Sequence, residues 1–413
     1  MIRQRRLFTD LLKHLPQKAY TIITGARQVG KTTLLRQLYQ HLHRDGKPVT
    51  YLSLEDPRVL AAASSHPDSL MQFLDVRPAP IIRQIQPQPV YLLVDEVQYA
   101  ADATHLLKYL YDQYEQNLKI VATGSSAFYI DQNFTDSLAG RKRIFQLYPL
   151  SFSELLEFQG EPDLVRQLER LRSDSAYRAP DLERLRAAWL EYLVYGGYPA
   201  VADERDPAGK RFLLEELKNA YVKRDLMESR VEKELKFYLL FQLLADQTGS
   251  QLNKQELANT AGLDAKTVDQ YVHILQKCFH IHLLRPFFRN LRKELTKMPK
   301  VYFHDLGMRN ALLNRFTAAA ERPDKGALLE NYIFLQIRNQ YPLDQIHYWR
   351  TSAQEEVDFV AEESFGQGKA FEVKWNAAAF DPKLYRAFRD AYPKFSLECL
   401  SADAFYWGGA GAS

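Results

Sequence analysis

The stretch IITGARQVGKTTLL, residues 22–35, decides the fold of the first part of the chain. An apolar, β-branched run ends in a turn bounded by Gly25 and Gly30, and residues 33–42 follow with helical periodicity. A strand, a glycine loop and a helix in this order place successive backbone N–H groups around a phosphate. The helix N-terminus adds its partial positive charge at the same place. A plain glycine turn is the alternative, which the complete spacing of the loop disfavours.

The nucleotide-contacting residues are expected to lie together in this loop and the first turn of its helix. Lys31 is expected to act as a point charge on the β- and γ-phosphates, and the Thr32 hydroxyl to ligate Mg²⁺. The sequence therefore predicts ATP and Mg²⁺ as cofactors. The expected contacts are Gly25, Ala26, Arg27, Gln28, Val29, Gly30, Lys31, Thr32 and Thr33.

Short apolar runs alternate with helical or loop segments over the first 150 residues, at positions 20–24, 49–54, 90–94, 119–123 and 143–147. This alternation predicts an α/β fold, a parallel sheet with helices on both faces. The third run ends in Asp95 and Glu96, and we expect Asp95 to hold Mg²⁺ through water and Glu96 to polarise the attacking water. Two solvated acids in a turn are the alternative. The strand at 49–54, between the two motifs, is typical of ATPases with a catalytic glutamate and disfavours a small GTPase.

Two further side chains are candidates for catalysis. Ser125 follows the fourth run, where its hydroxyl or that of Thr123 could orient the water; a hydroxyl-rich turn is the alternative. Arg141 precedes the last strand and could reach the γ-phosphate of a neighbouring subunit. A surface arginine that caps the strand is the alternative for Arg141.

Composition sets the broad class of the protein. The chain has 413 residues, of which 25% are charged and 46% apolar, an ordinary globular composition that suggests two to four domains. The formal net charge of +3 says little about partners. Cys278 and Cys399 form neither a metal-binding spacing nor a disulfide framework, which fits a reducing cytoplasm. No apolar run predicts a membrane span, and residues 1–16 favour an amphipathic helix over a signal peptide.

Several motifs together resemble a known family. GARQVGKTTLL, LLVDEVQ, ATGSSA, AGRKRIFQLYPLSFSE and YGGYPAV are similar to motifs of the bacterial and archaeal AAA+ superfamily ATPases that carry a C-terminal PD-(D/E)xK nuclease-like domain. The resemblance implies ATP binding, hydrolysis to ADP, and a homo-oligomer with the site between subunits. The expected domains are an AAA+ P-loop core at 1–150, a helical lid at 151–235, a winged helix-turn-helix with a basic linker at 236–300, and the nuclease-like domain at 301–413.

The middle of the chain is predicted to be helical. Ser151 and Glu154 have the spacing of a capping box at a helix start, and Gly196 and Gly197 are expected to form a tight bend. Residues 252–284 predict a helix-turn-helix with its turn at Gly262 and a β-like wing. This module could read DNA or serve as a structural connector, because its exposed positions carry little net positive charge.

A basic segment follows the helix-turn-helix. Residues 285–300 hold six Lys or Arg against the single Glu294, interleaved with aromatic residues. We expect these cations to contact DNA phosphates, and a solvated basic linker is the alternative. The expected DNA contacts are Arg285, Arg289, Arg292, Lys293, Lys297 and Lys300.

The last part of the chain carries an ordered set of acids. Glu330 lies on an expected helix, Asp358 on a strand, and Glu372 and Lys374 two positions apart on the next strand, where they share a face. Such carboxylates can hold divalent metal, with the lysine placed to orient or deprotonate a water, and phosphodiester hydrolysis is the natural chemistry. However, residues 301–413 contain 12 Lys or Arg and 15 Asp or Glu, so this segment is net acidic and would not hold DNA alone. Members of the resembled family can also keep this fold as a binding scaffold with little cleavage.

These features favour a Mg²⁺-dependent ATPase that acts as a cytoplasmic oligomer on branched or broken DNA, in repair, recombination or defence. Two alternatives remain at this point. One is a metal-dependent DNA nuclease that ATP gates. The other is an ATP-switched scaffold for protein partners with no role in nucleic-acid binding.

Overall fold

The computed structural model describes residues 3–124, 140–174, 176–228, 233–287, 297–351 and 353–405. The chain forms two compact units. The first comprises Met1–Tyr148 with Lys277–Phe279, and the second comprises Pro149–Gln276 with His280–Ser413.

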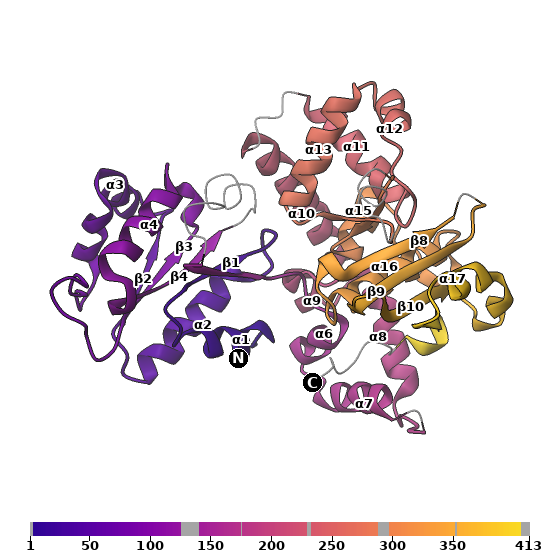
Figure 1. Cartoon of the computed structure of the whole chain (residues 1–413), viewed down its shortest axis with the longest axis horizontal. Helices are drawn as coiled ribbons and strands as arrows, with labels where there is room; N and C mark the ends of the chain where they lie inside the picture. The colour runs from indigo at the N-terminus through magenta and orange to yellow at the C-terminus, as the bar shows by residue number, and fades with distance from the viewer. Residues whose placement is uncertain are drawn as a thin grey trace. The chain divides into compact units, whose positions relative to one another are not determined.

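The first unit is built on a five-stranded parallel sheet in the order β2-β3-β4-β1-β5. Its strands are β1 (Tyr20–Thr24), β2 (Val49–Ser53), β3 (Val90–Asp95), β4 (Leu118–Gly124) and β5 (Lys142–Gln146). Its helices are α1 (Leu7–His14), α2 (Lys31–Arg44), α3 (Pro57–Ser65) and α4 (Ala103–Tyr114). Figure 1 shows α1 and α2 on one face of the sheet and α3 and α4 on the other. The predicted α/β fold with a parallel sheet is confirmed.

Helices cover both faces of this sheet, so residues that point to either side along its central strands are buried. Ile22 and Ile120 pack into a core with Leu107 of α4. Their neighbours Thr21 and Val121 are equally buried and are not members of that core. A fully buried aliphatic side chain contributes about 1.5–3 kcal/mol of transfer free energy. This packing fixes the carboxyl ends of β1, β4 and β3 side by side.

The second unit contains most of the helices. They are α6 (Phe152–Gln159), α7 (Pro162–Ser173), α8 (Leu182–Tyr195), α9 (Pro199–Asp203), α10 (Pro207–Glu228), α11 (Glu234–Asp246), α12 (Lys254–Ala261), α13 (Ala265–Lys277), α15 (Leu306–Leu313), α16 (Lys325–Arg338) and α17 (Arg386–Ala391). The predicted capping box opens α6: the Ser151 hydroxyl accepts from the Glu154 N–H, and the Glu154 carboxylate accepts from the Ser151 N–H.

The segment expected to be an ATPase lid shares one hydrophobic core with the C-terminal segment. Trp189 of α8 is fully buried, and its ring lies edge-on to Tyr332 of α16 at 5.8 Å between centroids. The same ring stacks on Phe405 at 5.1 Å. The described residues of these two segments therefore share one core within the second unit.

The glycine pair at 196 and 197 serves close packing. The Asp305 carboxylate accepts a hydrogen bond from the Gly197 N–H at 2.7 Å and caps α15 through the Met308 N–H at 2.7 Å. Gly196 has φ of +69°, and a Cβ on it would lie 2.5 Å from the Asp305 carboxylate. A Cβ on Gly197 would lie 2.0 Å from the Leu150 carbonyl oxygen. No other residue fits either position without a shift of the backbone around it.

Helices α12 and α13 form the predicted helix-turn-helix, with Gly262 in the left-handed region between them. Strand β6 (Ile281–Leu284) follows and pairs antiparallel with β7 (Lys300–Phe303). Strand β7 thus completes the wing, although all but its first residue fall in the expected C-terminal domain at 301–413. The boundary expected at residue 300 therefore falls at the start of a strand rather than in a linker.

The C-terminal segment forms a four-stranded sheet in the order β11-β10-β9-β8. Its strands are β8 (Ile346–Arg350), β9 (Glu356–Ser364), β10 (Gln367–Lys374) and β11 (Phe395–Ser401). β9 pairs antiparallel with both β8 and β10, and β11 is parallel to β10. Helix α16 packs against β10.

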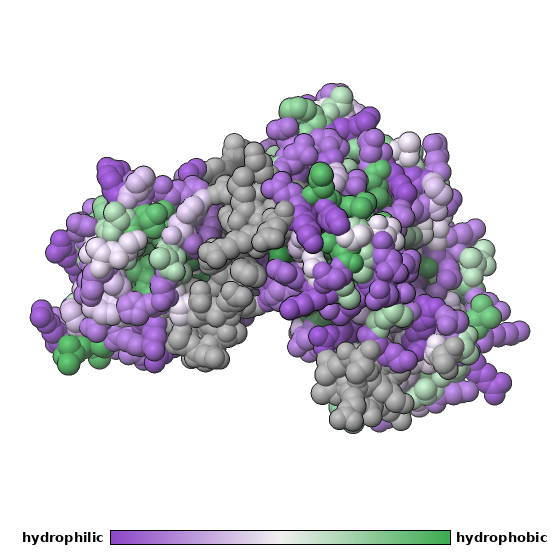
Figure 2. All heavy atoms as spheres, turned by 90° about the horizontal axis from the view of Figure 1, so that it is seen from above, coloured by the Kyte–Doolittle hydropathy of each residue, from purple (hydrophilic) through white to green (hydrophobic). Residues whose placement is uncertain are grey.

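In the described part of the chain, none of the helices combines the length and the apolar character that a membrane span requires. On the face that Figure 2 shows, hydrophilic residues predominate and hydrophobic ones form small separate groups. Polar and charged side chains are therefore what this face offers to a partner.

Candidate functional site

The loop from Gly25 to Gly30 joins β1 to the N-terminus of α2, as the sequence predicts. Gly30 has φ of +98° and Gln28 has φ of +54°, so the loop takes left-handed turns before the helix begins. A Cβ on Gly25 would lie 2.0 Å from the Leu147 carbonyl oxygen, which reserves this position for glycine. Open space surrounds the corresponding point on Gly30.

Two basic side chains fix the loop from inside. Lys31 is 5% exposed, and its Nζ donates to the Gly25 and Ala26 carbonyls at 2.9 and 2.8 Å. Arg5 is also buried, and its guanidinium donates to the Val29 carbonyl at 2.7 Å and the Tyr148 carbonyl at 2.8 Å. Arg5 was not predicted as a site residue, because nothing in the sequence of a basic N-terminus indicates which cation is buried.

The two acids of the second motif lie at the carboxyl end of β3, beside β4. Thr123 connects them: its hydroxyl donates to Asp95 Oδ1 and accepts from the Glu96 N–H at 3.0 Å. Asp95 is 3% exposed, and its Oδ2 accepts from the Tyr51 hydroxyl at 2.7 Å. Burial and this hydrogen bond to Asp95 raise the pKa of Tyr51. Glu96 has φ of +57°, and its carboxylate accepts from the Gln98 amide.

The residues at this edge of the sheet fit a nucleotide with Mg²⁺. β4 lies between β1 and β3, so the glycine loop, Thr123 and Asp95 follow or end adjacent strands. The Lys31 ammonium already sits on loop carbonyls that phosphate oxygens can replace. The buried Asp95 carboxylate and the half-buried Thr32 hydroxyl are the oxygen ligands that Mg²⁺ prefers.

The two remaining catalytic candidates stand differently. Ser125 lies outside the described residues. Arg141 immediately precedes β5, at the end of the sheet opposite the glycine loop, since its carbonyl accepts from the Tyr20 N–H at 2.8 Å. Its guanidinium binds Asp112 at 2.5 Å and lies over the Tyr111 ring. A contact from Arg141 to a neighbouring subunit stays a prediction.

The four C-terminal candidates come together as the sequence predicts. Lys374 Nζ lies 2.5 Å from Glu372 Oε1 on the shared face of β10. Asp358 on β9 accepts from the Val373 N–H at 2.8 Å. Burial raises the pKa of both Glu330 and Glu372 to about 7, and the charge of Asp358 adds to both shifts.

Lys300 corrects one prediction, because it lies among these acids and not on a DNA-binding surface. It is 2% exposed, and its ammonium lies 3.0 Å from Glu330, 2.6 Å from Glu356 and 3.4 Å from Asp358. An ammonium held in this way cannot reach a phosphate. The alternation of side chains along the strand could have indicated that Lys300 is buried, because it places Lys300 on the same face as Tyr302. Both side chains contact Glu330.

The carboxylates do not fit a divalent metal as they stand. Lys300 occupies the space that a cation would take between Glu330 and Asp358. Across the ranges that the structure describes, no group of three or more His, Cys, Asp or Glu side chains is arranged to hold a metal ion. The nuclease chemistry expected from this set therefore has no metal site in this arrangement.

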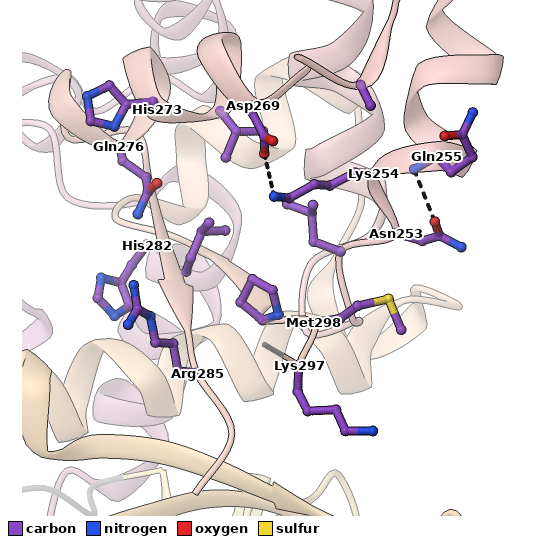
Figure 3. Close-up of a pocket in the computed structure, with 15 residues that line it drawn as sticks. Asn253, Lys254, Gln255, Asp269, His273, Gln276, His282, Arg285, Lys297 and Met298 are labelled. Atoms are coloured by element: carbon purple, nitrogen blue, oxygen red, sulfur yellow. Dashed lines mark hydrogen bonds and ion pairs between the residues drawn. The ribbon is translucent and has the colours of Figure 1, made fainter. Parts of the chain in front are cut away.

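A cleft of about 810 Å³ lies between the helix-turn-helix and its wing. Figure 3 shows Asp269, His273 and Gln276 along α13, with His282 and Arg285 beside them. Its charged lining consists of three cations, Lys254, Arg285 and Lys297, and one carboxylate, Asp269, which pairs with Lys254 at 2.6 Å.

Arg285 and Lys297, predicted as DNA contacts, are both exposed at this cleft. Burial, with the nearby cations Arg338 and Arg285, lowers the pKa of His282 to about 4, so its imidazole is neutral at pH 7. The other predicted DNA contacts, Arg289, Arg292 and Lys293, lie outside the described residues.

Comparison with known proteins identifies the first unit. Residues 17–156 match the family model described as an AAA domain. Residues 186–319 and 325–406 match two further models, each described as a domain of unknown function. The chain therefore contains an AAA-type P-loop ATPase domain, and no matched description assigns a nuclease to its C-terminal part.

The relatives reported below match three quarters of this chain or more. An uncharacterized protein of Haemophilus influenzae is 24% identical, over 96% of this chain and 93% of its own. Uncharacterized protein MJ1637 of Methanocaldococcus jannaschii is 26% identical, over 77% of this chain and 67% of its own. Among solved structures, C. elegans PCH-2 matches with a TM-score of 0.33 and 14% identity, over 53% of this chain and 69% of that one.

Proposed function

We propose that this protein is a Mg²⁺-dependent ATP hydrolase whose second unit binds DNA. One observation carries the ATPase part: the Thr123 hydroxyl hydrogen-bonds both the Asp95 carboxylate and the Glu96 N–H. Thr123 lies on β4, which lies between β1 and β3 in the strand order. Because β1 leads into the glycine loop, this loop follows the strand beside Thr123.

Each residue has a defined task in this proposal. The loop N–H groups and Lys31 bind the phosphates, and Thr32 and Asp95 would hold Mg²⁺, which neutralises phosphate charge when bound. Glu96 accepts a proton from the attacking water and orients it. Tyr51 and Thr123 keep Asp95 in place, because each donates a hydrogen bond to one of its oxygens.

The DNA part of the proposal rests on the cleft beside α13. Exposed Arg285 and Lys297 offer charge to phosphates, while Asn253, Gln255 and Gln276 offer amides to sugars or base edges. Asp269, the one carboxylate among the described residues that line the cleft, is already paired with Lys254. The described lining therefore has two more cations than carboxylates, an excess of positive charge that favours a polyanion over a neutral peptide.

The test is steady-state ATP hydrolysis with single-stranded, duplex and four-way-branched DNA, with Lys31→Ala as the blank. We expect at least one DNA form to stimulate hydrolysis. The double variant Arg285→Ala, Lys297→Ala should lose the stimulation, keep the basal rate, and reduce the slope of log K against log salt by about 2. Lys383→Ala with Lys394→Ala, exposed cations elsewhere on the same unit, is the matched control. Hydrolysis that no DNA changes would favour the ATP-switched scaffold.

We also propose that the protein works as a homo-oligomer in which Arg141 contacts the nucleotide of a neighbouring subunit. Arg141 would have to exchange Asp112 for that phosphate, and the exposed position of this ion pair permits the exchange. Light scattering of the Glu96→Gln variant with ATP measures the assembly directly. A monomer at every protein concentration would contradict this part of the proposal.

A further inference from the structure

Lys300 is the first residue of β7, and three carboxylates from two other elements surround its ammonium. Glu330 comes from α16, and Glu356 and Asp358 come from β9. Nζ lies 3.0, 2.6 and 3.4 Å from their nearest oxygens, in that order. The Tyr348 ring lies beneath the ammonium, 5.6 Å from it to the ring centroid. This lysine is therefore enclosed by acceptors and an aromatic face.

The other contacts of these carboxylates come from the protein itself. The Tyr302 hydroxyl donates to Glu330 at 2.5 Å, and the Val373 N–H donates to Asp358 at 2.8 Å. Glu356 accepts from Arg350 at 2.7 Å. Each acid thus has two donors, one of which is Lys300. Donors from the protein therefore compensate the charge of Glu330, Glu356 and Asp358, whereas Oε2 of the neighbouring Glu372 is buried with no hydrogen-bond partner among the described residues.

The charge state of Lys300 follows from the same contacts. Lysine carries a positive charge at neutral pH in water, and three carboxylate oxygens within 3.4 Å of Nζ favour that charged form in the protein. The ammonium is therefore charged at neutral pH. It supplies to the carboxylates the positive charge that a divalent metal supplies in an acid cluster of this composition.

We propose that Lys300 is a built-in counter-ion that occupies the cation position of the C-terminal acid cluster, so that this part of the protein works without a divalent metal. It follows that the chain does not cleave phosphodiester bonds through a metal ion held between Glu330 and Asp358. The cluster then has a structural task, because Lys300 joins the wing to helix α16 and strand β9.

Lys300→Met tests the proposal, because it keeps the length of the side chain and removes its charge. Three carboxylates would then share a buried pocket without a cation. We expect the melting temperature of the nucleotide-free, full-length variant to fall in EDTA by about 10 °C. Mn²⁺ should restore most of the loss, because the vacated pocket offers it three oxygen ligands.

The wild-type protein should melt at the same temperature in EDTA and in Mn²⁺, in the absence of nucleotide. Lys297→Met, an exposed lysine of the same segment, is the matched control and should respond to neither. Wild-type protein that Mn²⁺ stabilises, with the stabilisation lost in Asp358→Asn, would overturn the proposal.

A second measurement tests the proposal even if Lys300→Met does not fold. Mn²⁺ electron paramagnetic resonance on the nucleotide-free wild-type protein should detect no bound ion. Plasmid incubated with this protein and Mn²⁺ should stay intact. Cleavage that Lys374→Ala abolishes and Lys31→Ala leaves unchanged would overturn the proposal without bearing on ATP hydrolysis.

Discussion

Lys31 and Lys300 are both buried lysines whose ammonium groups find different partners. Lys31 donates to two neutral loop carbonyls, Gly25 and Ala26, and phosphate oxygens are stronger acceptors that can replace them. Lys300 is bound to three carboxylates. A ligand that replaced them would leave three buried acids without their counter-charge, which is costly in free energy. The first lysine is therefore suited to bind a ligand, and the second to hold elements of the fold together.

Arg5 gives a test of the loop at the level of one residue. Its guanidinium holds the Val29 and Tyr148 carbonyls, so Arg5→Leu should loosen the loop without touching the nucleotide. Loss of charge-assisted hydrogen bonds of about 1.5–3 kcal/mol predicts a rise in KM for ATP of about tenfold or more. Arg5→Lys should recover part of this loss. Arg3→Leu, which removes the same charge from an exposed position, is the control, and equal KM values for both leucine variants would contradict the positioning role.

At the scale of elements, helix α1 is fastened to the sheet through its last residue. His14 Nδ1 lies 2.8 Å from the Thr21 hydroxyl of β1, and the ring packs edge-on against Phe145 of β5. Burial, with the charges of Lys119 and Arg143, lowers the pKa of His14 to about 4. The neutral imidazole is therefore the form that this packing accepts.

This contact predicts that acid destabilises the first unit. As pH falls from about 6.5 to about 4, the unfolded chain binds a proton at His14 before the folded chain does, so stability is lost across that window and is fully present above it. The melting temperature measured at pH 7 and pH 5 should fall less in His14→Gln than in the wild type. His41→Gln, on the half-exposed side of α2, is the control. An equal fall in all three proteins would contradict the assignment.

Elements with a strong local pattern were predictable, and those that depend on distant partners were not. The strands β1 to β5 and the helix-turn-helix follow from periodicity and glycine positions, and both are present within a residue or two. The pairing of β7 with β6 was not predicted, because it depends on tertiary structure.

The candidate sites follow the same rule. The nucleotide loop and the acids after β3 are short contiguous motifs, and each was found from the sequence. Lys300 was interpreted as the end of a basic run, because Glu330, Glu356 and Asp358 lie 30 to 58 positions away and meet it only in the folded chain. The composition of a segment indicates its average charge, but whether one of its lysines can contact DNA depends on whether the folded chain buries that lysine.

At the scale of the whole molecule, each unit carries its own site. The glycine loop, Asp95 and Glu96 belong to the first unit, while the cleft beside α13 and the Lys300 cluster belong to the second. DNA-stimulated hydrolysis would be the measurable sign that the two units are coupled. Basal hydrolysis needs only the first unit, so it tests the central claim without any assumption about DNA.

The most direct measurement compares ATP binding with phosphate release, in Mg²⁺, for the wild type, Glu96→Gln and Lys31→Ala. We predict that Glu96→Gln binds ATP as tightly as the wild type. It should release phosphate at least about 100-fold more slowly, because it lacks the proton acceptor. Lys31→Ala should lose both binding and release. Phosphate release by the wild type no faster than by Lys31→Ala, or release by Glu96→Gln at the wild-type rate, would contradict the account.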